Sequence, residues 1–191
     1  MNNSSPDRFF HPWHSLPVGN NAPHAVNSVI EIPQGSRTKY ELDKQTGFLR
    51  LDRVLASLLS YPFHYGFIPQ TYCEDKDPLD IIILCSEPLI PLSIVEVTVL
   101  GAVEMVDQGE QDDKIIGVAT HDPFMKHKEK LADINPEILS AIQHFFEEYK
   151  KPEGKSVVIK KFLEKHEATA LITKSIELYR QQKDAIVATI F

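Results

Sequence analysis

The sequence predicts a mainly β protein of the α+β class, an antiparallel sheet or barrel with helices packed against it. Short segments with strand-like apolar patterns fill the first two thirds of the 191 residues, and segments with helical spacing appear only in the last third. The length is typical of one domain, since domains run roughly 100–200 residues. We expect a polar N-terminal arm over residues 1–24, pinned by the single tryptophan, Trp13, and one domain over residues 25–191.

The first predicted strands lie within residues 25–54. Residues 25–33 form a strand-like run that ends at a proline. Residues 38–42 alternate between polar and apolar side chains, and residues 48–54 alternate again after a turn. The three segments together are typical of a β-meander.

The central strands are marked by apolar runs. Residues 61–69 are aromatic and bounded by prolines, which predicts a non-helical connection. Residues 79–84 are almost continuously apolar, as in a strand that is buried on both faces. The valine-rich residues 93–106 predict a long strand bent at Gly101, and residues 115–119 predict the next one.

Two helices and a short strand are predicted near the C-terminus. A helix over residues 135–149 begins with Asn-Pro, a cap residue followed by proline at the first helical position. Residues 156–159 predict a short strand. Residues 164–182 predict a second helix with apolar side chains on one side. The apolar residues 185–191 are expected to pack on the body or on another subunit.

Composition excludes several classes of protein. The formal net charge of −7 argues against nucleic-acid binding through a basic surface. No apolar run reaches the roughly 18 residues that span a bilayer, and no signal-peptide pattern is present, so we expect no membrane association. The cysteines, Cys73 and Cys85, do not form a C-x-x-C pair. We expect them to be inert thiols in a reducing cytoplasm.

Two acidic clusters border apolar runs and suggest a site for hard cations. The first, residues 75–80, contains Asp75, Asp77 and Asp80, and the second covers residues 107–114. Carboxylate oxygens suit magnesium, calcium or manganese. An EF-hand loop is excluded because its required glycine and glutamate positions are not filled. A solvated acidic turn remains the simplest alternative for either cluster taken alone.

Other residues favour a metal and phosphate site over that alternative. Asp80 begins an apolar strand, where an unpaired carboxylate is costly to bury, and Pro78 stiffens the loop. Lys39, Arg53, Lys114 and Lys150 could be surface charges individually. Together with two carboxylate loops they are the set that phosphoryl transfer uses. The sequence contains no P-loop.

These residues resemble the family I soluble inorganic pyrophosphatases. Asp75 to Ile82 matches the family signature, D-x-D-P-x-D followed by aliphatic residues. Six further ordered segments are similar: Glu31-Ile32-Pro33, Lys39 to Asp43, Asp52-Arg53, Tyr61-Pro62 with Tyr65-Gly66, Asp107 with Asp112-Asp113-Lys114, and His144 to Lys150. Lys76 stands where the family usually has a small or polar residue, and it either weakens metal binding slightly or points to solvent.

The resemblance implies an OB-type five-stranded β-barrel with two C-terminal helices packed outside, and magnesium-dependent hydrolysis of pyrophosphate to two phosphates. It implies that Asp77 is the catalytic carboxylate, which activates a water or hydroxide bridging the metals for attack on phosphorus. The implied metal carboxylates are Asp75, Asp80, Asp107 and Asp112 directly, and Glu31 and Glu41 through water. The implied substrate contacts are Lys39, Arg53, Tyr65, Lys114, Tyr149 and Lys150.

Other functions stay open at this point. A module that only binds magnesium and phosphate would not need all the cations, whereas a nucleotide or polyphosphate hydrolase would need a base-binding pocket that sequence does not reveal. An OB-type barrel that binds single strands is disfavoured by the net charge. Because the family is commonly oligomeric, a homo-oligomer is implied, and a hexamer suits a chain of this length.

Overall fold

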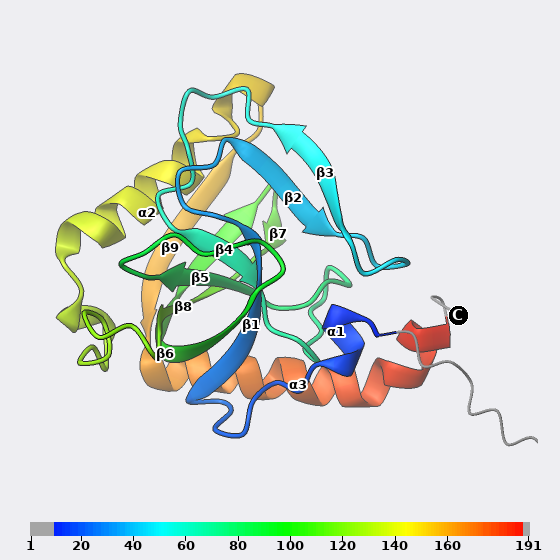
Figure 1. Cartoon of the computed structure of the whole chain (residues 1–191). Helices are drawn as coiled ribbons and strands as arrows, with labels where there is room; N and C mark the ends of the chain where they lie inside the picture. The colour runs from blue at the N-terminus through cyan, green and yellow to red at the C-terminus, as the bar shows by residue number, and fades with distance from the viewer. Residues whose placement is uncertain (1–9, 189–191) are drawn as a thin grey trace, which may run out of the picture.

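Five strands close into a ring (Figure 1). In ring order they are β1 (Ala25–Ile32), β4 (His64–Phe67), β5 (Asp80–Leu84), β8 (Lys114–Ala119) and β6 (Ile94–Asp107), and β6 pairs back to β1. All neighbours are antiparallel except β5 and β8, which run parallel. The ring confirms the expected mainly β fold built on a five-stranded OB-type barrel. The structure is a computed structural model and describes residues 10–188, so residues 1–9 of the predicted arm and residues 189–191 of the apolar tail lie outside it.

Three pairings lie outside the ring. The long strand β6 also pairs with β9 (Val157–Glu164) and with the two-residue β7 (Glu110–Gln111). The strands β2 (Thr38–Leu42) and β3 (Leu49–Val54) form a separate hairpin. The predicted meander over residues 25–54 is therefore wrong, because β1 pairs with β4 and β6 and not with β2. Six of the eight residues of β1 are buried, which fits a strand with partners on both edges.

Three helices and two short 3₁₀ turns complete the described chain. They are α1 (Pro12–Ser15), the 3₁₀ turn Leu131–Asp133, α2 (Pro136–Glu148), the 3₁₀ turn Lys151–Glu153, and α3 (Lys165–Ala188). The start of α2 is as predicted, since the Asn135 side chain accepts a hydrogen bond from the Glu137 backbone N–H. Helix α3 extends six residues beyond its predicted end at Gln182. No helix within residues 10–188 combines the length and apolar character needed to cross a bilayer.

The apolar side chains of the ring point alternately into two core clusters. Along β5, Ile82 belongs to the cluster that includes Phe145 of α2, whereas Ile81 and Ile83 belong to the cluster that includes Ile172 of α3. All three isoleucines of β5 are fully buried. The continuous apolar run over residues 79–84 thus forms a strand buried on both faces, as predicted. The two C-terminal helices pack outside the ring on different sides of it (Figure 1).

Candidate active site

A cleft with a volume of about 240 Å³ is lined by residues that range from Trp13 to Lys150 in the sequence. Every predicted site residue except Arg53 lines it. Its carboxylates are Glu31, Glu41, Asp75, Asp77, Asp80, Asp107 and Asp112; its lysines are Lys39, Lys44, Lys114 and Lys150; its tyrosines are Tyr40, Tyr61, Tyr65 and Tyr149. Carboxylates outnumber lysines seven to four, so the cleft carries excess negative charge when all these groups are ionised.

The parallel pairing of β5 and β8 builds the centre of the cleft. Asp80 is the first residue of β5 and Lys114 the first of β8, and the register pairs Ile81 with Ile115. The two strands therefore begin side by side at the same end of the ring. Lys114 Nζ lies 2.5 Å from Asp80 Oδ2 and also donates to Asp112, two residues earlier in the chain.

Burial and neighbouring charges shift the pKa values of the groups in this cluster. Lys114 is only 3 % exposed; burial disfavours its charge, but Asp80 and Asp112 outweigh burial and raise its pKa. Burial raises the pKa of Asp80, with a further contribution from Asp112, while Lys114 opposes the rise. The Tyr65 hydroxyl donates a hydrogen bond of 2.5 Å to Asp80 Oδ2. Burial and the nearby carboxylates raise the pKa of Tyr65, so this hydroxyl keeps its proton.

A second lysine–carboxylate contact closes the far side of the cleft. Lys150 follows the end of α2 and its ammonium group donates to Asp107 Oδ2, at the end of β6. Within the described residues, Asp107 Oδ1 is buried and has no hydrogen-bond partner. Tyr149 caps α2, stacks on Phe145 at 4.9 Å, and lies 5.3 Å from Lys150 Nζ, measured to its ring centroid.

The two glutamates of the cleft differ in their surroundings. Glu31 on β1 is 6 % exposed, and its Oε1 accepts a 2.7 Å hydrogen bond from the Leu42 backbone N–H. Burial, followed by the charge of Asp80, raises the pKa of Glu31 to about 8. Glu41 lies on the exposed face of β2 and contacts the ammonium group of Lys39, two residues earlier. The alternation predicted for this strand places both side chains on one face.

Arg53 lies next to the cleft without lining it. It is opposite Lys39 across the β2–β3 hairpin. Its Nη1 donates a 2.6 Å hydrogen bond to Asp52, and its Nε lies 3.3 Å from Glu153. Among the described residues, none accepts a hydrogen bond from the buried Nη2 of Arg53. The guanidinium thus keeps donor capacity for an anion.

Sequence reasoning missed Lys44, which lies in the β2–β3 turn. Its ammonium group pairs with Asp77 and donates to the backbone carbonyl of Lys76 at 3.2 Å. Both partners of the ion pair are about half exposed. No pattern singles out a lysine in a polar turn, so only the fold could reveal this contact. Lys76 itself is exposed, with a backbone φ of 69°.

The carboxylate oxygens of the cleft fit divalent cations, although in this structure several of them contact lysines. Within residues 10–188, no three histidine, cysteine, aspartate or glutamate side chains are arranged to hold a metal ion. Three features nevertheless fit a hard cation: the oxygen ligands, the unpartnered oxygen of Asp107, and the raised pKa values of Glu31 and Asp80. The oxygen of Asp107 is free to accept a bond, and the two pKa values are raised by burial and by neighbouring carboxylates, whose charge a bound cation would offset.

Comparisons with known proteins agree on one family. The family model described as inorganic pyrophosphatase matches residues 28–180. A soluble inorganic pyrophosphatase of Zea mays is 47% identical over 171 residues, covering 90% of this chain and 80% of the maize protein. One from Chlamydomonas reinhardtii is also 47% identical, over 90% of this chain and 89% of its own length. The crystal structure of the inorganic pyrophosphatase from Thermus thermophilus superposes with a TM-score of 0.85 at 41% identity, covering 88% of this chain and 99% of that one.

Proposed function

This chain belongs to the inorganic pyrophosphatase family, and from that premise we propose that it hydrolyses pyrophosphate to two orthophosphates with magnesium as its metal. The observation that carries the proposal is the cleft itself, where seven carboxylates and four lysines face one space. Carboxylates suit a divalent cation and lysines suit phosphate oxygens. A site for a magnesium–pyrophosphate complex needs both kinds of group.

We propose that four aspartates hold magnesium directly and two glutamates hold it through water. The direct ligands are Asp75, Asp80, Asp107 and Asp112, and the outer carboxylates are Glu31 and Glu41. The buried, unpartnered Oδ1 of Asp107 supports this assignment, and so does the burial of Asp80 beside Asp112, which raises the pKa of Asp80. Magnesium, when bound, neutralises phosphate oxygens as a Lewis acid and lowers the pKa of water.

The cationic residues bind the substrate and the leaving phosphate. With their carboxylate partners engaged by cations, the ammonium groups of Lys114 and Lys150 are free to pair with phosphate oxygens. Lys39 and Arg53 approach from the β2–β3 hairpin, and the unpartnered Nη2 of Arg53 supports such a role. The hydroxyls of Tyr65 and Tyr149 add hydrogen bonds to the phosphate oxygens. Together with the ammonium groups, they stabilise the negative charge that develops on the leaving phosphate.

Asp77 is proposed to take the proton from the attacking water. Its side chain is 47% exposed, lines the cleft and pairs with Lys44. The ion pair with Lys44 holds the Asp77 carboxylate at the cleft, and a general base must lie within hydrogen-bond reach of the proton that it takes.

The first test measures phosphate released from pyrophosphate, from ATP and from tripolyphosphate, each with and without magnesium. We expect rapid release from pyrophosphate only with magnesium, and much slower release from the two longer substrates. Hydrolysis of ATP but not of pyrophosphate would overturn the proposed substrate.

The second test replaces the proposed base. Asp77→Asn keeps the size of the side chain, so the fold should persist while kcat falls by roughly 10²–10⁴-fold. Glu74→Gln is the matched control, because Glu74 is in the same loop but is 82% exposed and pairs with Lys174 outside the cleft. An unchanged kcat in Asp77→Asn would remove Asp77 from this role.

We also propose that the protein is a homo-oligomer, with a hexamer favoured. Several large apolar side chains are exposed on the single chain, among them Leu58 (90%), Ile90 (77%) and Phe124 (70%). Burying such side chains between subunits would stabilise an assembly. Light scattering during size-exclusion chromatography should give six times the chain mass of 21.7 kDa, and a monomer mass would refute the assembly.

A cytoplasmic location is proposed from the thiol chemistry. Cys73 and Cys85 are free and half-buried. Burial raises the pKa of Cys73 to about 12, so its thiol resists oxidation. Two unpaired thiols suit a reducing compartment. Cell fractionation should place the protein with cytosolic markers, and recovery with an organelle would contradict the proposal.

A further inference from the structure

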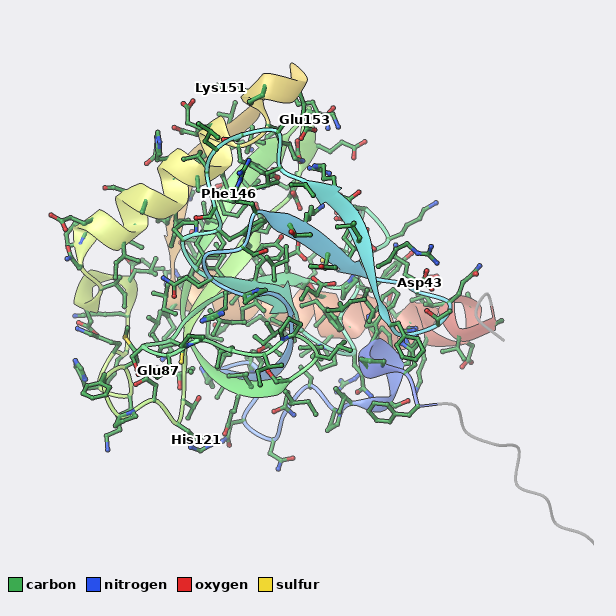
Figure 2. All side chains as sticks on the ribbon, turned by 45° about the horizontal axis from the view of Figure 1, so that its top comes forward. Asp43, Glu87, His121, Phe146, Lys151 and Glu153 are labelled. Atoms are coloured by element: carbon green, nitrogen blue, oxygen red, sulfur yellow. The ribbon has the colours of Figure 1, made fainter. Side chains whose placement is uncertain are left out.

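Helix α1 contacts one of the two loops that carry side chains into the cleft directly, and reaches the other through one intervening residue. One is the β2–β3 turn (Asp43–Gly47), and the other is the carboxylate loop (Asp75–Asp80). Figure 1 shows α1 at the tip of the β2–β3 hairpin, and Figure 2 shows the labelled Asp43 of that turn above the same helix. Helix α1 lies before residue 28, where the match to the family model begins.

His11 connects α1 to the β2–β3 turn. Its ring is 1 % exposed, Nδ1 accepts a hydrogen bond from the Trp13 backbone N–H at 3.3 Å, and Nε2 lies 3.1 Å from the carbonyl oxygen of Lys44. Since Nδ1 accepts, Nε2 carries the proton and donates to Lys44. The packing is equally close: a Cβ on Gly47 would lie 2.9 Å from the Pro12 ring.

Trp13 connects α1 to the base of the carboxylate loop. Its indole Nε1 donates a 2.8 Å hydrogen bond to the carbonyl oxygen of Thr71. The Thr71 hydroxyl accepts a 2.8 Å hydrogen bond from the backbone N–H of Leu79, the residue before Asp80. Both Trp13 and Thr71 are almost completely buried. Trp13 therefore supports the segment that carries Asp80 through a single intervening residue.

The two loops also contact each other, which completes a closed set of contacts. Lys44 pairs with Asp77 and donates to the carbonyl oxygen of Lys76. Helix α1 is in turn fixed to α3, because His14 Nδ1 and the Tyr179 hydroxyl are 2.8 Å apart. The positions of the turn, the loop and α1 thus depend on one another.

We propose that α1 positions the carboxylate loop and the β2–β3 turn relative to each other, with Trp13 and His11 as positioning residues for catalysis. The inference rests on the proposed hydrolysis of pyrophosphate at this cleft. Trp13 also forms part of the cleft wall, but neither residue has to touch the reacting atoms. Each acts through a backbone carbonyl, of Thr71 and of Lys44 respectively. Small displacements of catalytic groups have large effects on rate, so these contacts influence turnover.

The kinetic test uses Trp13→Phe, which keeps an aromatic ring and removes the indole N–H. We expect kcat to fall about tenfold, because the carboxylate loop is held less firmly in place, and half-maximal activation to need more magnesium. The KM for pyrophosphate should change less than twofold, because the hydrogen bonds of Lys114 and Lys150 within residues 10–188 go to Asp80, Asp112 and Asp107, and not to α1. The matched control is Asn27→Ala, which removes a 3.0 Å hydrogen bond to Pro17 in the arm beyond α1 and should leave kcat and magnesium activation unchanged.

A pair of substitutions at His11 separates positioning from general stability. His11→Gln keeps an N–H that reaches the Lys44 carbonyl, whereas His11→Ala does not. We expect His11→Gln to retain near wild-type kcat and His11→Ala to lose it together with tight magnesium activation. Equal kcat and equal magnesium dependence in wild type, Trp13→Phe and His11→Ala would overturn the proposal.

Amide hydrogen exchange tests the same inference without any activity. In Trp13→Phe, exchange should accelerate about tenfold at Leu79 and within residues 43–47 and 75–80, while β6 and β8 exchange as in wild type. If Trp13→Phe does not fold, Thr71→Val removes the hydroxyl that accepts from Leu79, and Thr71→Ser retains it. Unchanged exchange in both loops would refute the proposal, even if hydrolysis of pyrophosphate is observed. Faster exchange in a protein that lacks this activity would refute only the proposed function.

Discussion

Lowering the pH from 7 to 5 should weaken the attachment of α1, because the structure holds His14 in its neutral form. His14 is 8 % exposed and stacks on Trp13, with 4.5 Å between ring centroids. Burial lowers the pKa of His14 to about 4, and the nearby charges of His11 and Lys183 act in the same direction. Within the described residues, its buried Nε2 has no hydrogen-bond partner that could stabilise a proton.

The sign and the size of the effect follow from linkage. Because the pKa of His14 is lower in the folded state than the usual 6.5, the unfolded chain binds more protons between about pH 4 and 6.5. The free energy of unfolding therefore falls as the pH drops through this window. With the two pKa values about 2.5 apart, the loss between pH 7 and pH 5 is about 2 kcal/mol.

The assay compares thermal unfolding of wild type and His14→Gln at both pH values. A loss of about 2 kcal/mol corresponds to a Tm decrease of roughly 4–8 °C for a chain of this size, beyond the decrease seen in the variant. His127→Gln, at an exposed position, is the control and should follow wild type. Equal Tm decreases in wild type and His14→Gln would refute the reasoning.

Three further outcomes are expected. Calcium should inhibit magnesium-supported hydrolysis, because its longer and less regular coordination fits an octahedral magnesium site badly; full turnover with calcium alone would contradict this. Gly66→Ala should cost about 3 kcal/mol or more, measured as a lower urea midpoint, since a Cβ there would lie 1.9 Å from the Val29 carbonyl oxygen on the paired strand; an unchanged midpoint would show that the strands can separate freely. Phe145→Ala should cost about 3–5 kcal/mol and raise the KM, because Phe145 is 2 % exposed and supports Tyr149; a stability loss without any change in KM would exclude the supporting role.

The sequence predicted most strands where a local pattern was strong. The alternation over residues 38–42 matches β2, and the apolar run at 79–84 matches β5. Short or mixed segments were missed: β4 (His64–Phe67) lies in an aromatic stretch bounded by prolines, and α1 has only four residues. The strand β9 continues to Glu164, beyond its predicted end at residue 159. The prediction ended too early because Lys160 and Lys161 interrupt the alternation of polar and apolar residues.

Local sequence patterns could not predict which strands pair or which distant side chains meet. Periodicity indicates which face of a strand is buried but not which strand pairs with it, so the pairing of β1 with β6 could not be predicted. The acidic clusters and their lysines were recognised by residue type and by family resemblance. The contact of Lys44 with Asp77 was not, because it depends on how two distant loops pack.

The cleft can form only after the ring of strands has closed. Cleft residues come from positions as far apart as Trp13 and Lys150, and the ring closes only when β1 meets β6, more than sixty residues later in the chain. Contacts between such distant segments form slowly, because a long loop must be ordered first. A nascent or truncated chain that lacks β6 and β8 therefore has no place to gather the carboxylates. During refolding, recovery of enzymatic activity should follow the same time course as recovery of tertiary structure.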